Sequence, residues 1–219
     1  MGEFITFARV VVGVIREASL FTFLALVVLT VSSGKWTWFN FHPLLMSVAY
    51  FLLARAVVAV QRKDVLLEKV CPEDRVGAHG ASAFLGITAG AIGGSVVYFY
   101  KTVNKIPHYQ TPHSLLGAAT FAMLLIQFAV GVAFTKTKVF GSRSALICRF
   151  HRVSGAIVMA LATATSILGW SEIRSDNVQP IGTASLILAL LSIAALLNWD
   201  DISKLFRQSK NPVSGAKGD

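Results

Sequence analysis

The chain alternates between long apolar runs and short polar segments. Six runs stand out, over about residues 12–32, 41–60, 77–100, 112–134, 147–170 and 180–198. Because an α-helix rises about 1.5 Å per residue, each run can cross roughly 30 Å of hydrocarbon with some tilt. The pattern therefore predicts an all-α membrane protein with six transmembrane helices, forming one domain over residues 1–219 with a polar tail at 204–219.

The composition excludes a soluble globular domain. Hydrophobic residues make up 54% of the chain and charged residues only 14%, against about 25% charged residues in average soluble domains. The net charge of +9 could indicate a nucleic-acid partner. However, the basic residues lie in short loops between apolar runs, where they act as topology signals, and we expect no nucleic acid. Arg9 and Arg16 could begin a signal peptide, but no small-x-small cleavage site leading to a soluble domain follows.

The loops alternate in their Lys and Arg content. Sixteen of the 20 basic residues fall on one side of the membrane, in the N-terminus, the second and fourth loops and the tail. The positive-inside rule predicts that this side, with both termini, is cytosolic. At the other face, aromatic residues form an interfacial belt: Trp36, Trp38, Phe39, Tyr98, Tyr100, Tyr109 and Trp170.

Four of the five histidines begin a predicted span. His42 and His113 lie at the outer ends of the second and fourth spans, and His79 and His151 lie at the cytosolic ends of the third and fifth. A four-helix core of spans two to five would bring each pair face to face at its own membrane depth. Helical bundles hold cofactors between facing helices in this way.

Each histidine pair offers two imidazoles with no nearby intramembrane carboxylate or thiolate. A zinc site needs three or four protein ligands, whereas two imidazoles complete a six-coordinate haem iron that transfers electrons. We therefore predict two haem b groups that form an electron path across the bilayer. Cys71 and Cys148 form no Cys-x-x-Cys-His site, so both haems would be non-covalent.

Two other functions use the same histidines. Intramembrane histidines also serve as proton relays, so a histidine-dependent proton or metal transporter or channel is the alternative. A non-catalytic interaction protein with structural haem is a third possibility.

Small residues accompany the histidines. Gly117 and Gly155 follow His113 and His151 by one helical turn, where they leave room for a large flat group. Other glycines lie where neighbouring helices should pass the two levels, at positions 93, 94 and 131. Ordinary helix packing in membranes also favours small residues, so each glycine taken alone has two explanations.

The pattern resembles the eukaryotic cytochrome b561 family over nearly the whole chain. The resemblance rests on Phe-His-Pro at 41–43, His79, His-Ser-Leu-Leu-Gly at 113–117, and His151 with Gly155. The short length is most similar to the branch called cytochrome b561 domain-containing proteins. The family's usual motif is His-Ser-Trp-Leu-Gly, and this chain has Leu115 in place of the Trp. The Arg- and aromatic-rich segment that ascorbate-using members carry at the end of the second helix is thin here, at 54–62.

The resemblance implies six helices, two b haems and electron transfer from cytosolic ascorbate to an acceptor on the other side of the membrane. The acceptor would be the monodehydroascorbate radical or a ferric chelate. The resemblance also suggests homodimers. We expect an endomembrane location, in the ER, vesicles or lysosomes, rather than the plasma membrane.

Candidate substrate residues lie at both faces. Arg149 and Arg152 flank His151, and Arg75 precedes His79 by one turn, so these cations could attract anionic ascorbate; positive-inside charge also explains them. At the outer face, the resemblance implies a substrate site beside a loop histidine. That residue would be His108, too shallow to ligate haem, or else a simple surface histidine; its neighbours are Lys101, Lys105 and Tyr109.

Overall fold

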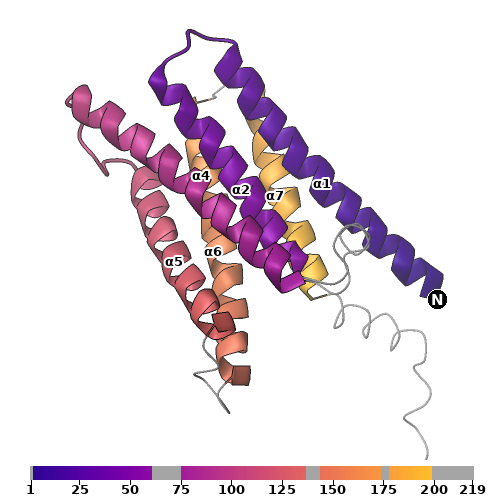
Figure 1. Ribbon diagram of the computed structural model, residues 1–219. Coiled ribbons are helices and arrows are strands. Elements are labelled where there is room, and N and C mark those ends of the chain that lie inside the picture. The colour runs from indigo at the N-terminus through magenta and orange to yellow at the C-terminus, as the bar shows by residue number, and fades with distance from the viewer. Residues whose placement is uncertain (1, 61–74, 137–143, 174–177, 199–219) are drawn as a thin grey trace, which may run out of the picture.

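The computed structural model describes residues 2–60, 75–136, 144–173 and 178–198, and every regular element in these ranges is helical. Figure 1 shows the arrangement. The elements are α1 (Gly2–Ser32), the short 3-10 helix η1 (Trp38–Asn40), α2 (Phe41–Ala59), α4 (Arg75–Val103), α5 (Pro112–Lys136), α6 (Ser144–Ile173) and α7 (Gln179–Leu197). The predicted all-α class is confirmed.

Helix boundaries follow the predicted runs closely except at the start. α2 through α7 begin and end within a few residues of the predicted spans. α1 instead begins at Gly2, ten residues before the predicted start, because Arg9 and Arg16 lower the hydropathy without breaking the helix. Cys71 and the tail at 204–219 lie outside the described residues, while Cys148 is an exposed free thiol.

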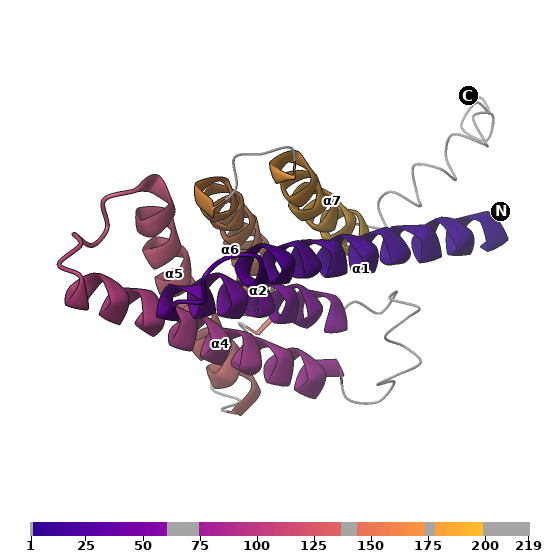
Figure 2. The ribbon, with the colours of Figure 1, turned by 90° about the horizontal axis from the view of Figure 1, so that it is seen from above.

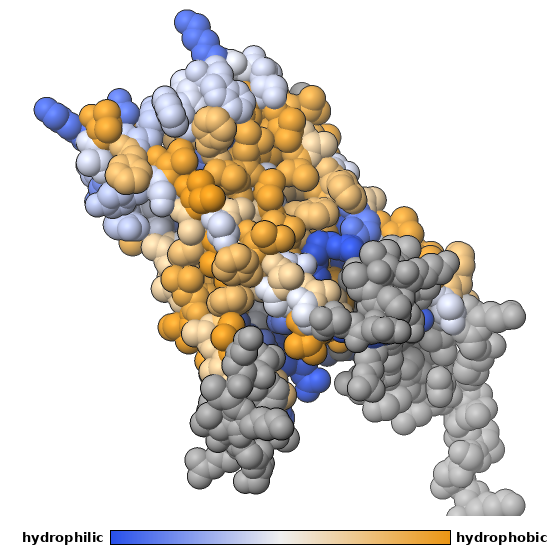
Figure 3. Space-filling model, viewed as in Figure 1, coloured by the Kyte–Doolittle hydropathy of each residue, from blue (hydrophilic) through white to orange (hydrophobic). Residues whose placement is uncertain are grey.

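The helices have the length and composition of membrane spans. Over the described residues, 5 of them are long and apolar enough to cross a membrane, and α7 carries a shorter apolar stretch, Gln179–Ala195. With 19 residues, α7 is still about 28 Å long. Figure 3 shows apolar side chains over the middle of the molecule, with hydrophilic residues gathered toward its ends. The chain is a multi-pass membrane protein.

The helices that begin with histidines pack as two pairs. α2 packs along α4, and α5 packs along α6 (Figures 1 and 2). Contacts between the two pairs, of α2 with α6 and of α4 with α5, are fewer. α1 and α7 pack against each other, and they flank the bundle against α2 and α6 respectively.

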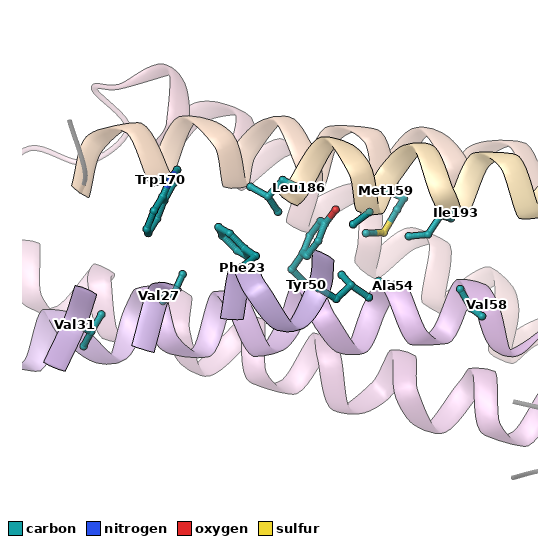
Figure 4. Close-up of a cluster of buried hydrophobic side chains, with 12 residues drawn as sticks. Phe23, Val27, Val31, Tyr50, Ala54, Val58, Met159, Trp170, Leu186 and Ile193 are labelled. Carbon is teal, nitrogen blue, oxygen red and sulfur yellow. The ribbon is translucent and has the colours of Figure 1, made fainter. Parts of the chain in front are cut away.

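The main buried cluster lies between these flanking helices and the bundle, as Figure 4 shows. Phe23 of α1 meets Trp170 of α6 edge to face at 5.8 Å, and the Tyr50 hydroxyl lies 2.9 Å from Thr163 Oγ1. Trp170 is only 2% exposed and its Nε1 donates to the Gln179 carbonyl at 2.9 Å. The prediction that Trp170 belongs to the interfacial belt is therefore wrong, because this indole holds α7 onto α6.

An ion cluster joins α1 to α2. Arg16 is 0% exposed, and its Nη2 lies 2.6 Å from Glu17 Oε1. Arg55 of α2 donates to the same carboxylate oxygen. Because this carboxylate lies between two guanidinium groups, the charged residues of α1 are compatible with a buried position.

Candidate functional site

The outer histidine pair lies at the starts of two helices. His42 is the second residue of α2 and His113 the second of α5, and Pro112 suits the first helical position because its missing N–H is not needed there. The two imidazole ring centres are 6.1 Å apart, with the planes inclined at 75°. Helix starts far apart in sequence thus bring these two rings together.

The inner pair has nearly the same geometry at the other ends of the helices. His79 lies near the start of α4 and His151 lies in the second turn of α6. Their ring centres are also 6.1 Å apart, with an interplanar angle of 80°. Each histidine pair has one imidazole from the helix pair α2 and α4 and one from the helix pair α5 and α6. Both histidine pairs therefore bridge the same interface between the helix pairs.

Three of the four imidazoles are oriented by backbone carbonyls. The Nδ1–H of His42 donates to the Gly93 carbonyl at 2.9 Å. His79 donates to Ala56 at 2.7 Å and His113 to Thr165 at 3.0 Å. Since a carbonyl oxygen only accepts, Nδ1 carries the proton and Nε2 keeps the lone pair that a metal requires.

The spacing of both pairs fits one metal ion between two imidazoles. Metal–imidazole bonds of about 2 Å, with each ring centre about 1.1 Å behind its nitrogen, place the two ring centres about 6 Å apart. Over the described residues, no group of three or more His, Cys, Asp and Glu side chains forms a metal cluster. Each pair offers two imidazoles, which is the number of protein ligands that a six-coordinate haem iron takes.

Comparison with known proteins agrees with this geometry. The family model for eukaryotic cytochrome b561 matches residues 41–175, which is more than half of the chain and includes all four paired histidines. The chain belongs to the eukaryotic cytochrome b561 family. Membership of this cytochrome family implies haem.

Individual relatives of this b561 protein are distant. The human probable transmembrane reductase CYB561D1 is 28% identical over 174 residues, covering 78% of this chain and 76% of that protein. The mouse plasma membrane ascorbate-dependent reductase CYBRD1 is 22% identical over 83% of this chain and 66% of its own length. The rat lysosomal membrane ascorbate-dependent ferrireductase CYB561A3 is 29% identical over 61% of this chain and 52% of its own length.

Glycines in this b561 chain meet the histidines in two places. A Cβ added at Gly169 of α6 would lie 2.7 Å from His113 Cε1. One added at Gly131 of α5 would lie 3.2 Å from His151 Cε1. Both glycines therefore let a helix backbone pass close to an imidazole. The sequence suggested Gly131 by its depth, but Gly169 was missed because depth does not reveal which face of α6 it occupies.

The other candidate glycines face protein atoms. The nearest atom to a Cβ at Gly117 is Thr165 Cγ2, at 3.4 Å, and at Gly155 it is Gln127 Nε2, at 2.9 Å. Gly93 lies against Leu45 of α2, at 3.1 Å. These glycines contribute to close packing within the pairs α5·α6 and α2·α4.

The inner end of the bundle carries the candidate ascorbate cations. Arg149 and Arg152 are exposed on α6 around His151, and Arg75 begins α4 one turn before His79. Arg55, which the sequence did not single out as a site residue, directly precedes Ala56, the acceptor for His79. Its guanidinium is paired with Glu17.

His108 at the outer face has a fixed orientation. Its ring stacks on Tyr98 with 4.6 Å between ring centres and 27° between planes, and its Nε2 lies 3.3 Å from Thr102 Oγ1. Both partners belong to the last turns of α4, and this contact was not predicted. Lys101 lies in the last turn of α4 in the same region, and two residues of the following loop have left-handed backbones, Lys105 (φ 55°) and Tyr109 (φ 56°).

The left-handed residue Lys105 closes α4. The Lys105 N–H donates to Thr102 O at 3.2 Å, and the Ile106 N–H donates to Lys101 O at 2.8 Å. These are the two hydrogen bonds of a Schellman motif, in which the residue after the helix takes a positive φ. The motif turns the chain back over α4, which brings His108 onto Tyr98.

Proposed function

We propose that this b561 protein is a transmembrane oxidoreductase that passes single electrons from cytosolic ascorbate through two bis-histidine b haems. The acceptor on the other side is the monodehydroascorbate radical or a ferric chelate. The observation that carries the proposal is the pair of matching imidazole sites, each with 6.1 Å between ring centres, at opposite ends of one bundle. Relatives named as ascorbate-dependent reductases support the donor.

The ligand roles follow from position. His42 and His113 hold the outer haem, and His79 and His151 hold the haem on the cytosolic side. When bound, a haem held by two imidazoles would supply one-electron transfer. The carbonyls of Gly93, Ala56 and Thr165 hold three of the imidazoles in one orientation.

At the cytosolic face, cations attract the donor. Ascorbate is an anion at neutral pH, and a cluster of positive charge raises the local concentration of anions. Arg149, Arg152 and Arg75 supply this charge beside the inner imidazole pair. Arg149 and Arg152 are exposed and Arg75 is half-buried, so all three can be reached by a cytosolic ligand.

At the outer face, His108 receives the acceptor. An imidazole can give or take a proton near neutral pH, which suits a partner that gains a proton with its electron. Lys101 and Lys105 attract an anionic acceptor, and Tyr109 lies beside His108 with 6.1 Å between ring centres.

The proposal includes an orientation and a location. Both termini lie in the cytosol, the protein forms homodimers, and it resides in an endomembrane of the ER, vesicles or lysosomes. The positive-inside distribution of Lys and Arg supports the orientation.

Spectroscopy of the purified protein tests the function. We expect a b-type absorbance at two haems per chain that ascorbate reduces. A colourless preparation that takes up no haem would favour the proton or metal transporter instead. Two haems that ascorbate and other cytosolic donors fail to reduce would identify a protein with structural haem.

A further inference from the structure

His151 is held differently from the other three paired histidines. Its Nδ1 is buried and has no hydrogen-bond partner among the described residues, whereas the Nδ1–H groups of His42, His79 and His113 donate to carbonyls. A ligand that lacks this bond needs another means of fixing its ring, because unconstrained rotation would misplace Nε2.

The side chain of Gln127, on the facing helix α5, is hydrogen-bonded to the backbone of His151. Gln127 Nε2 donates to the His151 backbone carbonyl at 2.5 Å. Its Oε1 accepts from Ser154 Oγ at 2.7 Å, so both ends of the amide are engaged with α6. Burying an amide in the middle of the apolar helix α5 costs free energy unless the amide is hydrogen-bonded. The hydrogen bonds of this amide go to the segment that carries His151.

Two glycines make this contact possible. A Cβ at Gly155 would lie 2.9 Å from Gln127 Nε2, so only glycine lets the amide reach the His151 carbonyl without displacement. One turn along α5 from Gln127, Gly131 lets the His151 ring lie against the helix backbone. Gln127 and Gly131 therefore face α6 together, one meeting the His151 backbone and the other its ring.

We propose that Gln127 is a positioning residue for the inner haem ligand His151. It fixes the backbone of His151, and with Gly131 it sets the ring orientation that the carbonyl bonds set for the other three imidazoles. Gln127 touches no substrate and acts only through His151. The inference rests on the proposed assignment of His79 and His151 to one haem.

The test compares Gln127→Leu and Gly155→Ala with the control Ile126→Leu. Gln127→Leu removes both hydrogen bonds, and Gly155→Ala keeps the amide but displaces it. Ile126 directly precedes Gln127 on α5 and is 65% exposed, so its variant changes the helix without touching α6. Each full-length protein is measured by low-temperature electron paramagnetic resonance of the ferric haems and by the haem-to-protein ratio. The His79→Ala protein identifies which signal belongs to the inner haem.

We expect both test variants to shift the inner haem signal and leave the outer one unchanged. We also expect them to release inner haem to an acceptor apoprotein about 10-fold faster, the usual effect of losing a residue that orients a metal ligand. Ile126→Leu should match the parent protein. If Gln127→Leu fails to fold, Gly155→Ala alone decides.

Two results would overturn the inference. Unchanged inner signals and release rates in the folded variants would leave Gln127 as a helix-packing residue, and equal shifts of both haems would indicate a general loosening of the bundle. Neither result touches the proposed function, which fails if the parent protein lacks two haems or if cytosolic donors do not reduce them.

Discussion

At the residue scale, backbone carbonyls hold three of the four paired histidines in one tautomer, and both pairs have the same spacing between ring centres. Three Nδ1–H groups donate to carbonyls of the adjacent helix in the same pair. A ring whose orientation is already fixed costs little reorganisation when a metal binds. The positions of the imidazoles are therefore set by helix pairing, and loss of any one should affect only its own pair.

The first prediction follows from this pairing. His42→Ala and His113→Ala should each remove one and the same haem, because each deletes one axial ligand of the outer site. His79→Ala and His151→Ala should each remove the other haem. Difference absorbance spectra and haem-to-protein ratios of the four purified variants check this. If His42→Ala and His79→Ala disturbed a common haem signal, the assignment by depth would be wrong.

The second prediction concerns His108. His108→Ala should keep both haems and normal reduction by inside ascorbate, but slow reoxidation by an outside acceptor about 100-fold, as expected for loss of a proton-transfer group. The measurement is stopped-flow haem absorbance in vesicles with the donor inside and the acceptor outside. Lys35→Ala, in the first outer loop, is the control and should reoxidise at the parent rate. Unchanged reoxidation of His108→Ala with several acceptors would make His108 a surface residue.

At the element scale, the depth of a residue in the membrane can be predicted from the sequence, but the face of the helix that it occupies cannot. The 3.6-residue period is weak in helices that are apolar all round, since lipid and protein neighbours favour similar side chains. The four histidines are marked by their polarity, so they could be paired by depth. The roles of Gln127 and Gly169 could not be predicted, because each depends on the rotation of a helix. The stack of His108 on Tyr98 could not be predicted either, because it depends on a loop turn.

The third prediction uses Gly169. Gly169→Ala places a methyl group 2.7 Å from the His113 ring, and an overpacked contact of this kind costs about 1–3 kcal/mol. The outer haem should be lost or bound weakly, and the inner haem should remain. Gly80→Ala is the control, because its Cβ would meet nothing within 4 Å. Haem content and the two haem spectra are measured, and equal effects of both substitutions would contradict the contact.

The fourth prediction concerns the link between α1 and α2. Glu17→Gln removes the charge that two guanidinium groups share, and leaving the buried Arg16 without its carboxylate should destabilise the fold by about 3 kcal/mol. Thermal unfolding in detergent measures this as a lower Tm. A double-mutant cycle with Arg55→Gln should be non-additive, because the two residues are in contact. Additive effects would show that the pair contributes no coupling.

At the scale of the whole molecule, the order of apolar runs and histidines was enough to predict the helical class and the family. The packing of the flanking helices was not predictable, as Trp170 shows. An indole near a helix end usually indicates a membrane interface, but here Gly182 allows α7 to approach so closely that a Cβ there would lie 2.4 Å from Trp170 Nε1. Only the three-dimensional contact of α6 with α7 separates these two roles.

The last prediction concerns topology, and it depends on α7. Its apolar stretch, Gln179–Ala195, is shorter than those of the other 5 helices, yet the 19-residue helix is about 28 Å long and can cross the hydrocarbon with little tilt. In Figure 1, the start of α1 and the end of α7 lie at the same end of the bundle. Tags at the two termini should therefore both react only from the cytosolic side in sealed vesicles.

A third tag, inserted between Asn104 and Lys105, should react only from the outer side, because this loop joins the outer ends of α4 and α5. It controls for vesicle leakage, since a leaky preparation would label all three tags from both sides. Termini on opposite sides would mean that an odd number of helices cross the membrane, and α7 would then be the helix that does not. The positive-inside count argues against this, because it assigns the Lys- and Arg-rich tail to the same side as Arg9 and Arg16.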